Sequence, residues 1–85
     1  LTVANLNPAL AEEIGAKEAG GVVILEVAGG SFARRLGLRP GDLILALNRR
    51  NTPAVSELVE VLRRPARGWE LTFERGGKPY TVQFR

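Results

Sequence analysis

The sequence predicts a small α+β domain, and three patterns lead to that prediction. Residues 22–27 (VVILEV) and 43–47 (LILAL) are short apolar runs bounded by turn residues, which are typical of buried β-strands. Residues 55–64 place apolar side chains at the three- and four-residue spacing of an amphipathic helix. Residues 69–84 alternate apolar and polar side chains on either side of a Gly-Gly pair, which is the pattern of a β-hairpin.

The chain is expected to begin with a strand, a helix and a second strand. Apolar residues near the start indicate a strand over residues 1–6. Asn7 can cap the helix that follows, because its side chain can accept a hydrogen bond from a free backbone N–H, and Pro8 fits the first helical position. Gly15 ends this helix, and the β-branched run at residues 22–27 forms the next strand.

The segment over residues 29–48 combines a helical turn, a tight turn and a strand. The hydroxyl of Ser31 can cap a helical turn over residues 31–36, and Gly37 suits the left-handed residue that ends it. The RPGD sequence that follows predicts a β-turn, in which Asp42 accepts hydrogen bonds from backbone N–H groups. The strand that comes next has no polar alternation, which predicts burial on both of its faces.

The second half of the chain is expected to hold one helix and a closing hairpin. Residues 48–51 (NRRN) predict a turn that leads into a short paired segment. Pro65 blocks continuation of the helix over residues 55–64. The strands over residues 69–74 and 79–84 join at a Gly-Gly pair that tolerates positive φ. The apolar stripe of the helix consists of Val55, Leu58, Val59 and Leu62.

The composition excludes several classes of function. Cysteine and histidine are both absent, so neither a disulfide, a thiolate nucleophile nor a Ser-His-Asp triad can be built, and we expect no catalysis within this chain. Because no group of acidic residues has the spacing of metal ligands, we also expect no metal and no cofactor.

The charge pattern and hydropathy limit the partners. The net charge of +3 comes from 12 Lys and Arg against 9 Asp and Glu, and the arginines are scattered along the chain. A nucleic-acid surface would need a basic face interleaved with aromatic residues, so we expect no nucleic-acid partner. No apolar run approaches the roughly 18 residues that span a membrane, so we expect no membrane insertion.

Residues 30–48 resemble the signature of bacterial PDZ domains, G-S-P-A-x-x-A-G-L-x-x-G-D-x-I-x-x-x-N. Phe32 stands where the signature has Pro, and Leu36 stands where it has Ala. Local packing is therefore expected to differ there, while the turn chemistry is kept. The matching residues are Gly30, Ser31, Ala33, Gly37, Leu38, Gly41, Asp42, Ile44 and Asn48.

The order of elements over the whole chain is similar to that of the second, C-terminal PDZ domain of periplasmic Do-like (HtrA) serine proteases. The resemblance implies an α+β fold, a PDZ-like partly open antiparallel β-barrel of five or six strands with two helices. It also implies a single domain over residues 1–85 that is a fragment of a longer periplasmic protease, whose catalytic triad lies upstream. A start in strand-like sequence without a signal peptide agrees with a fragment.

The resemblance also implies where a ligand binds. The first strand, Leu1, Thr2, Val3 and Ala4, would pair with an extended peptide, and Val55, Val59 and Leu62 would form the opposite wall of the groove. Of the hydrophobic-Gly-hydrophobic loop that holds a terminal carboxylate in this family, only Leu1 is present. Apolar helix residues are also typical of a core, which is the role we expect for Leu58. Core and groove roles both remain open for Val55, Val59 and Leu62.

The resemblance implies three alternative functions. The first is a non-catalytic module that binds hydrophobic C-terminal peptides of misfolded envelope proteins by β-augmentation. The aliphatic groove residues favour a hydrophobic terminal side chain, and no residue supports a Ser or Thr preference two positions upstream. The second is an assembly role, in contact with the protease domain and other subunits of the parent oligomer. The third is a PDZ domain of another envelope protease or of a secretion protein.

Overall fold

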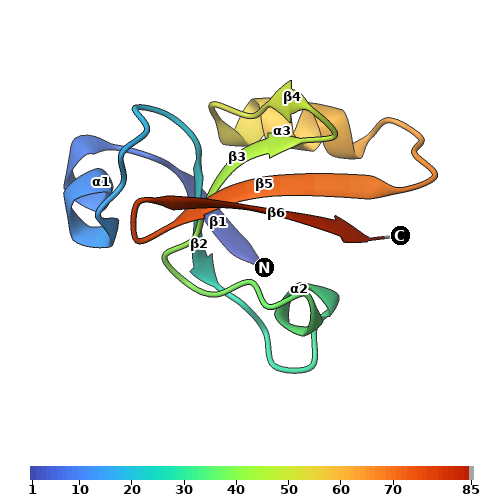
Figure 1. The fold of residues 1–85 in the computed structure, drawn as a ribbon, viewed down its shortest axis with the longest axis horizontal. Coiled ribbons are helices and arrows are strands. Elements are labelled where there is room, and N and C mark those ends of the chain that lie inside the picture. The colour runs from blue at the N-terminus through green and yellow to red at the C-terminus, as the bar shows by residue number, and fades with distance from the viewer. Residues whose placement is uncertain (85) are drawn as a thin grey trace.

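The computed structural model describes residues 1–84 and shows an open, strongly twisted sheet with helices around it (Figure 1). It has six strands and three helices. The elements are, in order, β1 (Thr2–Asn5), α1 (Pro8–Ile14), β2 (Val22–Glu26), α2 (Phe32–Arg35), β3 (Leu43–Leu47), β4 (Arg50–Asn51), α3 (Val55–Leu62), β5 (Trp69–Arg75) and β6 (Lys78–Phe84).

All strand pairs are antiparallel, and the strand order is β1-β2-β3-β5-β6, with the short β4 paired to β3. The sheet stays open because β1 and β6 lie at its two edges. These features confirm the predicted fold. The third helix is α2, which is the helical turn expected over residues 31–36.

Local capping and turn chemistry explain most element boundaries. The side chain of Asn7 accepts a hydrogen bond from the Leu10 N–H at 2.9 Å, and Ser31 accepts one from the Arg34 N–H at 3.2 Å. Both caps were expected from the sequence. The β5–β6 hairpin turns through Gly76 and Gly77, whose φ values of 58° and 80° place both in the left-handed region that favours glycine.

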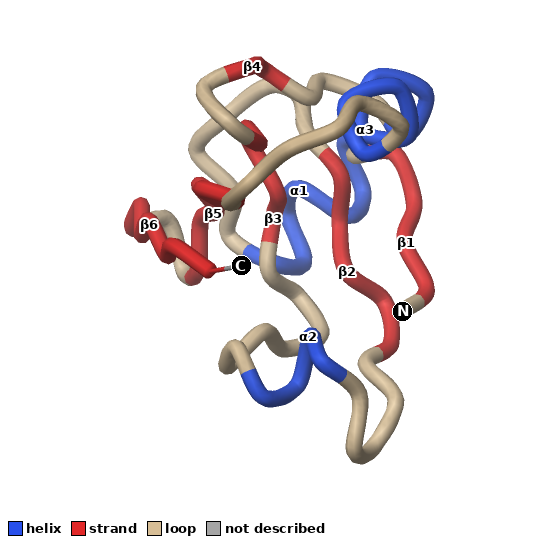
Figure 2. The backbone as a smooth tube through the Cα atoms, turned by 90° about the vertical axis from the view of Figure 1, so that its right-hand side faces the viewer, coloured by secondary structure: helices blue, strands red, loops and turns tan. Residues whose placement is uncertain are grey.

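α3 lies against the sheet beside β1 (Figure 2) and also contacts β3. The core side chains gather between this helix and the sheet. Leu58 and Val61 are the buried residues of α3 and pack against the sheet. Leu38, which follows α2, reaches the same cluster and anchors that segment. The other buried members are Val22, Ile24, Ile44, Leu47, Leu71 and Phe73.

Three details differ from the expectations. First, α3 ends at Leu62 instead of residue 64, because the Arg64 N–H bonds to the Val61 carbonyl at 3.1 Å and tightens the last turn before Pro65. Second, β3 is half-buried at residues 45–46, where its pairing with β5 is irregular. Third, Glu74, expected on the polar face of its strand, is buried and accepts a hydrogen bond from the Lys17 N–H at 2.7 Å.

Thr52 offers a test of the packing beside β4. Its side chain is fully buried, and its hydroxyl has no hydrogen-bond partner among residues 1–84. An unpaired buried hydroxyl costs about 1–3 kcal/mol, so Thr52→Val is expected to raise the free energy of unfolding by about 1–2 kcal/mol in urea denaturation. The control is Thr72→Val. The Thr72 hydroxyl hydrogen-bonds that of Thr81 at 3.3 Å in an exposed position, so its loss should change the free energy of unfolding little. Destabilisation by Thr52→Val would show that this hydroxyl is satisfied in solution.

No helix within the described part of the chain has both the length and the apolar character needed to cross a membrane.

Candidate functional site

β1 and α3 lie side by side and run in opposite directions. At one end, the side-chain oxygen of Asn5 accepts a hydrogen bond from the backbone N–H of Val55, the first residue of α3, at 2.7 Å. At the other end, Leu1 and Leu62 line one cavity. The strand and the helix therefore border the groove expected from the sequence, with this hydrogen bond joining them at one end and the cavity at the other.

The edge of β1 that faces away from β2 is open. In residues 1–84, β1 pairs with β2 alone, and the Leu6 N–H donates to the Gly21 carbonyl at 3.0 Å. Because backbone groups alternate in direction along an antiparallel strand, the N–H and C=O groups of Val3 and Asn5 point away from β2. These groups are available to pair with an added strand.

The cavity at the Leu1 end of the groove measures about 160 Å³. An apolar cavity of about 150 Å³ can hold a benzene ring, so this one has room for one apolar side chain. A larger depression of about 480 Å³ beside α1 is different, because Glu13, Arg39 and Arg75 contribute to its wall. The cavity lining is apolar throughout: Leu1, Phe32, Ala33, Leu36, Leu38, Ile44, Leu47, Leu58, Leu62, Leu71 and Phe84.

Two aromatic rings form part of this wall. Phe32 of α2 and Phe84 of β6 meet edge to face, with ring centroids 5.5 Å apart and planes inclined by 60°. The guanidinium of Arg35 lies 5.9 Å from the centroid of Phe32, within cation–π range. Phe32 is 47% exposed, so it lies at the rim of the cavity, and this is the residue that replaces the Pro of the bacterial signature.

The groove residues named from the sequence fall into two groups. Leu1 and Leu62 line the cavity and are 58% and 54% exposed. The other five do not line this cavity. Thr2 and Ala4 belong to β1 and pair with Glu26 and Val23 of β2, while Val3 packs against the core. On α3, Val55 packs partly against the core and Val59 is 39% exposed.

Leu58 is buried, as expected for a core residue, and it also lines the cavity. Sequence reasoning missed the contributions of α2 and β6 to the same wall, namely Phe32, Ala33, Leu36 and Phe84. The three-residue spacing of Ala33 and Leu36 was the available signal, because it places both side chains on one face of a short helix. No local pattern links Phe84 to that helix.

An ion pair holds the segment after α2 against the sheet. The carboxylate of Asp42 accepts hydrogen bonds from Arg75 Nε at 2.8 Å and Arg75 Nη2 at 2.7 Å, and also from the Arg39 N–H at 2.9 Å. Arg75 Nη2 donates in addition to the Gly37 carbonyl at 2.8 Å. The hydrogen bond to Asp42 holds the pKa of Arg75 above its ordinary value. The end of α2, and with it one wall of the cavity, is thereby fixed to β5.

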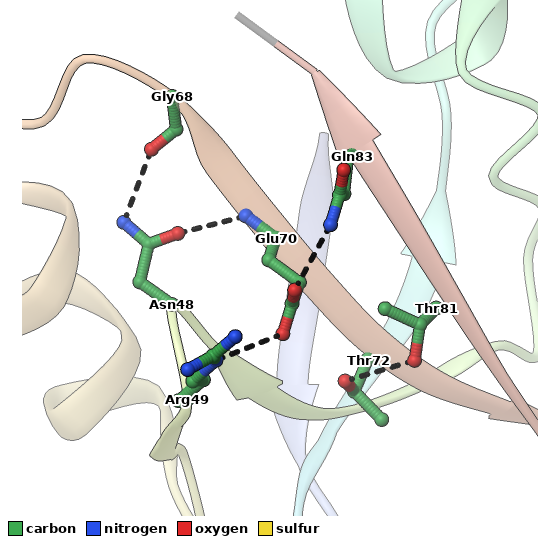
Figure 3. A network of polar contacts seen from close by, with 7 residues as sticks. All are labelled: Asn48, Arg49, Gly68, Glu70, Thr72, Thr81 and Gln83. Carbon is green, nitrogen blue, oxygen red and sulfur yellow. Dashed lines mark hydrogen bonds and ion pairs between the residues drawn. The ribbon is translucent and has the colours of Figure 1, made fainter.

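A second polar network fixes the loop that follows α3 (Figure 3). The side chain of Asn48 accepts from the Glu70 N–H at 2.7 Å and donates to the Gly68 carbonyl at 3.4 Å. Glu70 accepts from Gln83 at 3.1 Å and lies 3.7 Å from Arg49 Nε. Because Arg49 and Gln83 already face the Glu70 carboxylate, we assign this network a structural role.

Residues 1–84 contain no group of three acidic side chains, histidines or cysteines close enough to hold a metal ion.

A family model described as PDZ domain matches residues 23–75. Among curated proteins, the chain is similar to a protein of Chlamydia pneumoniae named probable periplasmic serine endoprotease DegP-like, with 39% identity over 64 residues. A protein of the same name from Rhizobium meliloti is 33% identical over 75 residues. The matches cover 74% and 86% of this chain but only 13% and 15% of the two relatives, so the chain corresponds to a small part of each.

Two solved structures share the fold, and both hold a peptide. The HtrA-type protease AlgW with decapeptide matches at a TM-score of 0.82 and 28% identity, over 100% of this chain and 27% of its own. The HtrA3 PDZ domain bound to a phage-derived ligand, FGRWV, matches at a TM-score of 0.73 and 28% identity, over 99% of this chain and 85% of its own.

Proposed function

The chain belongs to the PDZ domain family, and from this premise we propose that it binds the C-terminal segment of a protein as an extended strand. The strand pairs with the open edge of β1, and its last side chain enters the apolar cavity beside Leu1 and Leu62. The observation that carries the proposal is the position of this cavity, which lies at the end of an unpaired sheet edge. The peptide ligands of the HtrA3 and AlgW structures support it.

The dimensions of the groove suit a ligand segment of about four residues. A strand of that length spans about 13 Å, and the eight residues of α3 rise about 12 Å, so both walls accompany the ligand over its full length. Val55, Val59 and Leu62 of α3 are aliphatic, which favours apolar ligand side chains on the helix side. The helix begins with Val55, whose side chain cannot hydrogen-bond a hydroxyl, so this position does not favour Ser or Thr two residues before the ligand's C-terminus.

We further propose that the parent protein is a Do-like serine protease of the periplasm. The names of the Chlamydia and Rhizobium relatives support both the chemistry and the compartment. In this proposal catalysis belongs to another part of the parent, and this domain captures hydrophobic C-termini of misfolded envelope proteins. Backbone N–H groups preceding Leu1 would hold the ligand's terminal carboxylate, as in the family.

Binding of the peptide FGRWV is expected to depend on its terminal carboxylate. The chain, with about ten residues of its parent restored before Leu1, is titrated with the free acid and with the C-terminal amide while backbone amide NMR shifts are followed. The free acid is expected to shift residues 1–4 and 55–62 in a saturable manner. The amide is expected to bind at least about tenfold more weakly, because it loses a charge-assisted hydrogen bond.

Absence of saturable shifts at millimolar peptide would contradict the peptide-binding proposal. It would favour the assembly role, in which the domain contacts the protease domain or other subunits. One observation favours that second role: within residues 1–84, β6 also pairs on one side alone, so a second open edge of seven residues is available for intersubunit pairing. Equal binding of acid and amide would support strand addition without capture of a terminal carboxylate.

A further inference from the structure

The first turn of α3 lacks a cap of its own. The N-cap position is occupied by Ala54, which has no side-chain acceptor, although the first N–H groups of a helix need partners outside it. Asn5 of β1 supplies one of them from 50 residues away, through its hydrogen bond to the Val55 N–H at 2.7 Å. A residue of the strand that forms one wall of the groove thus caps the helix that forms the other.

This contact differs from the other links at the same end of the groove. The Leu6 N–H bonds to the Gly21 carbonyl, and the Gly21 N–H bonds to the Pro53 carbonyl, so the chain before α3 is held to β2 and β1. Neither of these backbone hydrogen bonds involves a residue of α3. Within residues 1–84, the Asn5 side chain makes the only hydrogen bond between β1 and α3.

We propose that Asn5 is a positioning residue of the groove, whose amide oxygen fixes the distance between β1 and the first turn of α3. The proposal rests on the proposed function, because a strand that inserts between these walls must pair with β1 and contact α3 at once. Leu58 in the middle of α3 and Val61 near its end are buried in the core, whereas Val55 in the first turn is only partly buried against it. Loss of the Asn5 contact therefore lets the first turn move while the helix stays folded. The groove is then less preorganised, which weakens binding.

The test uses three variants and the peptide FGRWV. Asn5→Ala removes the acceptor and is expected to raise the Kd about tenfold, with a lower unfolding midpoint. Asn5→Asp keeps an acceptor oxygen and is expected to leave the Kd within about twofold of the wild type. The double variant Asn5→Ala/Ala54→Asp gives α3 a local cap, which is expected to restore the midpoint but leave the Kd raised, because a local cap makes no link to β1.

The double variant separates positioning from simple helix stabilisation. Recovery of the Kd together with the midpoint would overturn the proposal, since Asn5 would then matter for helix stability alone. An Asn5→Ala variant that binds as tightly as the wild type would also overturn it. Ala54→Asp in the wild-type background controls for the added charge. If the wild type itself binds no peptide, the proposed function fails, and the role of Asn5 fails with it.

Discussion

Replacing Arg75 by methionine is expected to lower the free energy of unfolding by about 3–5 kcal/mol, measured by urea denaturation at neutral pH. The side chain of Asp42 is 2% exposed, and its carboxylate accepts three hydrogen bonds, two of them from Arg75. Methionine is long enough to fill much of the space but donates no hydrogen bond. Within residues 1–84, the variant therefore leaves the buried carboxylate of Asp42 with the Arg39 N–H as its one donor. For a domain of this size, that loss is a large fraction of the total stability.

Replacing Asp42 is expected to lower the free energy of unfolding less than replacing Arg75. The side chain of Arg75 is 32% exposed, so an unpaired Arg75 can turn to water. Asp42→Asn keeps an acceptor for the Arg39 N–H and should cost only about 1–2 kcal/mol. Arg49→Met is the matched control, since the Arg49 side chain is 86% exposed and its removal should cost less than about 0.5 kcal/mol. Equal effects of Arg75→Met and Arg49→Met would show that the Asp42–Arg75 pair contributes nothing specific.

This ion pair illustrates what the sequence cannot reveal. The role of Asp42 as a turn cap followed from the RPGD pattern, because a cap and its N–H lie three residues apart. Its pairing with Arg75 spans 33 residues and depends on how β5 packs beside the turn. Caps, turns and strand patterns were predictable because each is decided within a few neighbouring residues. Contacts that depend on packing between distant segments have no such local signal.

The candidate site likewise has parts that the local sequence predicts and parts that depend on packing between distant segments. The edge strand and α3 followed from the resemblance, and periodicity gave the apolar stripe of α3. Periodicity could not decide between core and groove for that stripe, because both environments select aliphatic residues. The structure places Leu62 at the cavity, and it brings in Phe32 and Phe84 from segments that are far apart in the chain. The shape of the cavity is therefore a tertiary property.

Ala33→Leu is expected to change folding and binding in opposite directions. Ala33 lies on α2, is half-buried and lines the cavity of about 160 Å³. Three added carbons can enter this space without displacing the core, and leucine is nearly as good a helix former as alanine. We expect the free energy of unfolding to rise by about 1 kcal/mol, because buried methylene groups contribute up to about 0.8 kcal/mol each. The same carbons occupy the space proposed for the ligand's last side chain. The Kd for FGRWV should therefore rise roughly thirtyfold, which corresponds to a loss of about 2 kcal/mol of binding free energy.

The decisive result is a gain in the free energy of unfolding together with a loss of peptide affinity, because damage to the fold would lower both. Ala9→Leu on the exposed surface of α1 is the matched control, and it should leave both the unfolding free energy and the Kd nearly unchanged. If Ala33→Leu stabilises the domain and FGRWV binds as before, the cavity belongs to the packing of the fold, and the terminal side chain of the ligand lies elsewhere along β1. If stability falls while affinity is kept, the cavity is too small in solution to accept a side chain. A more stable domain together with weaker peptide binding is the one combination that agrees with a preformed apolar cavity that binds one side chain of a partner.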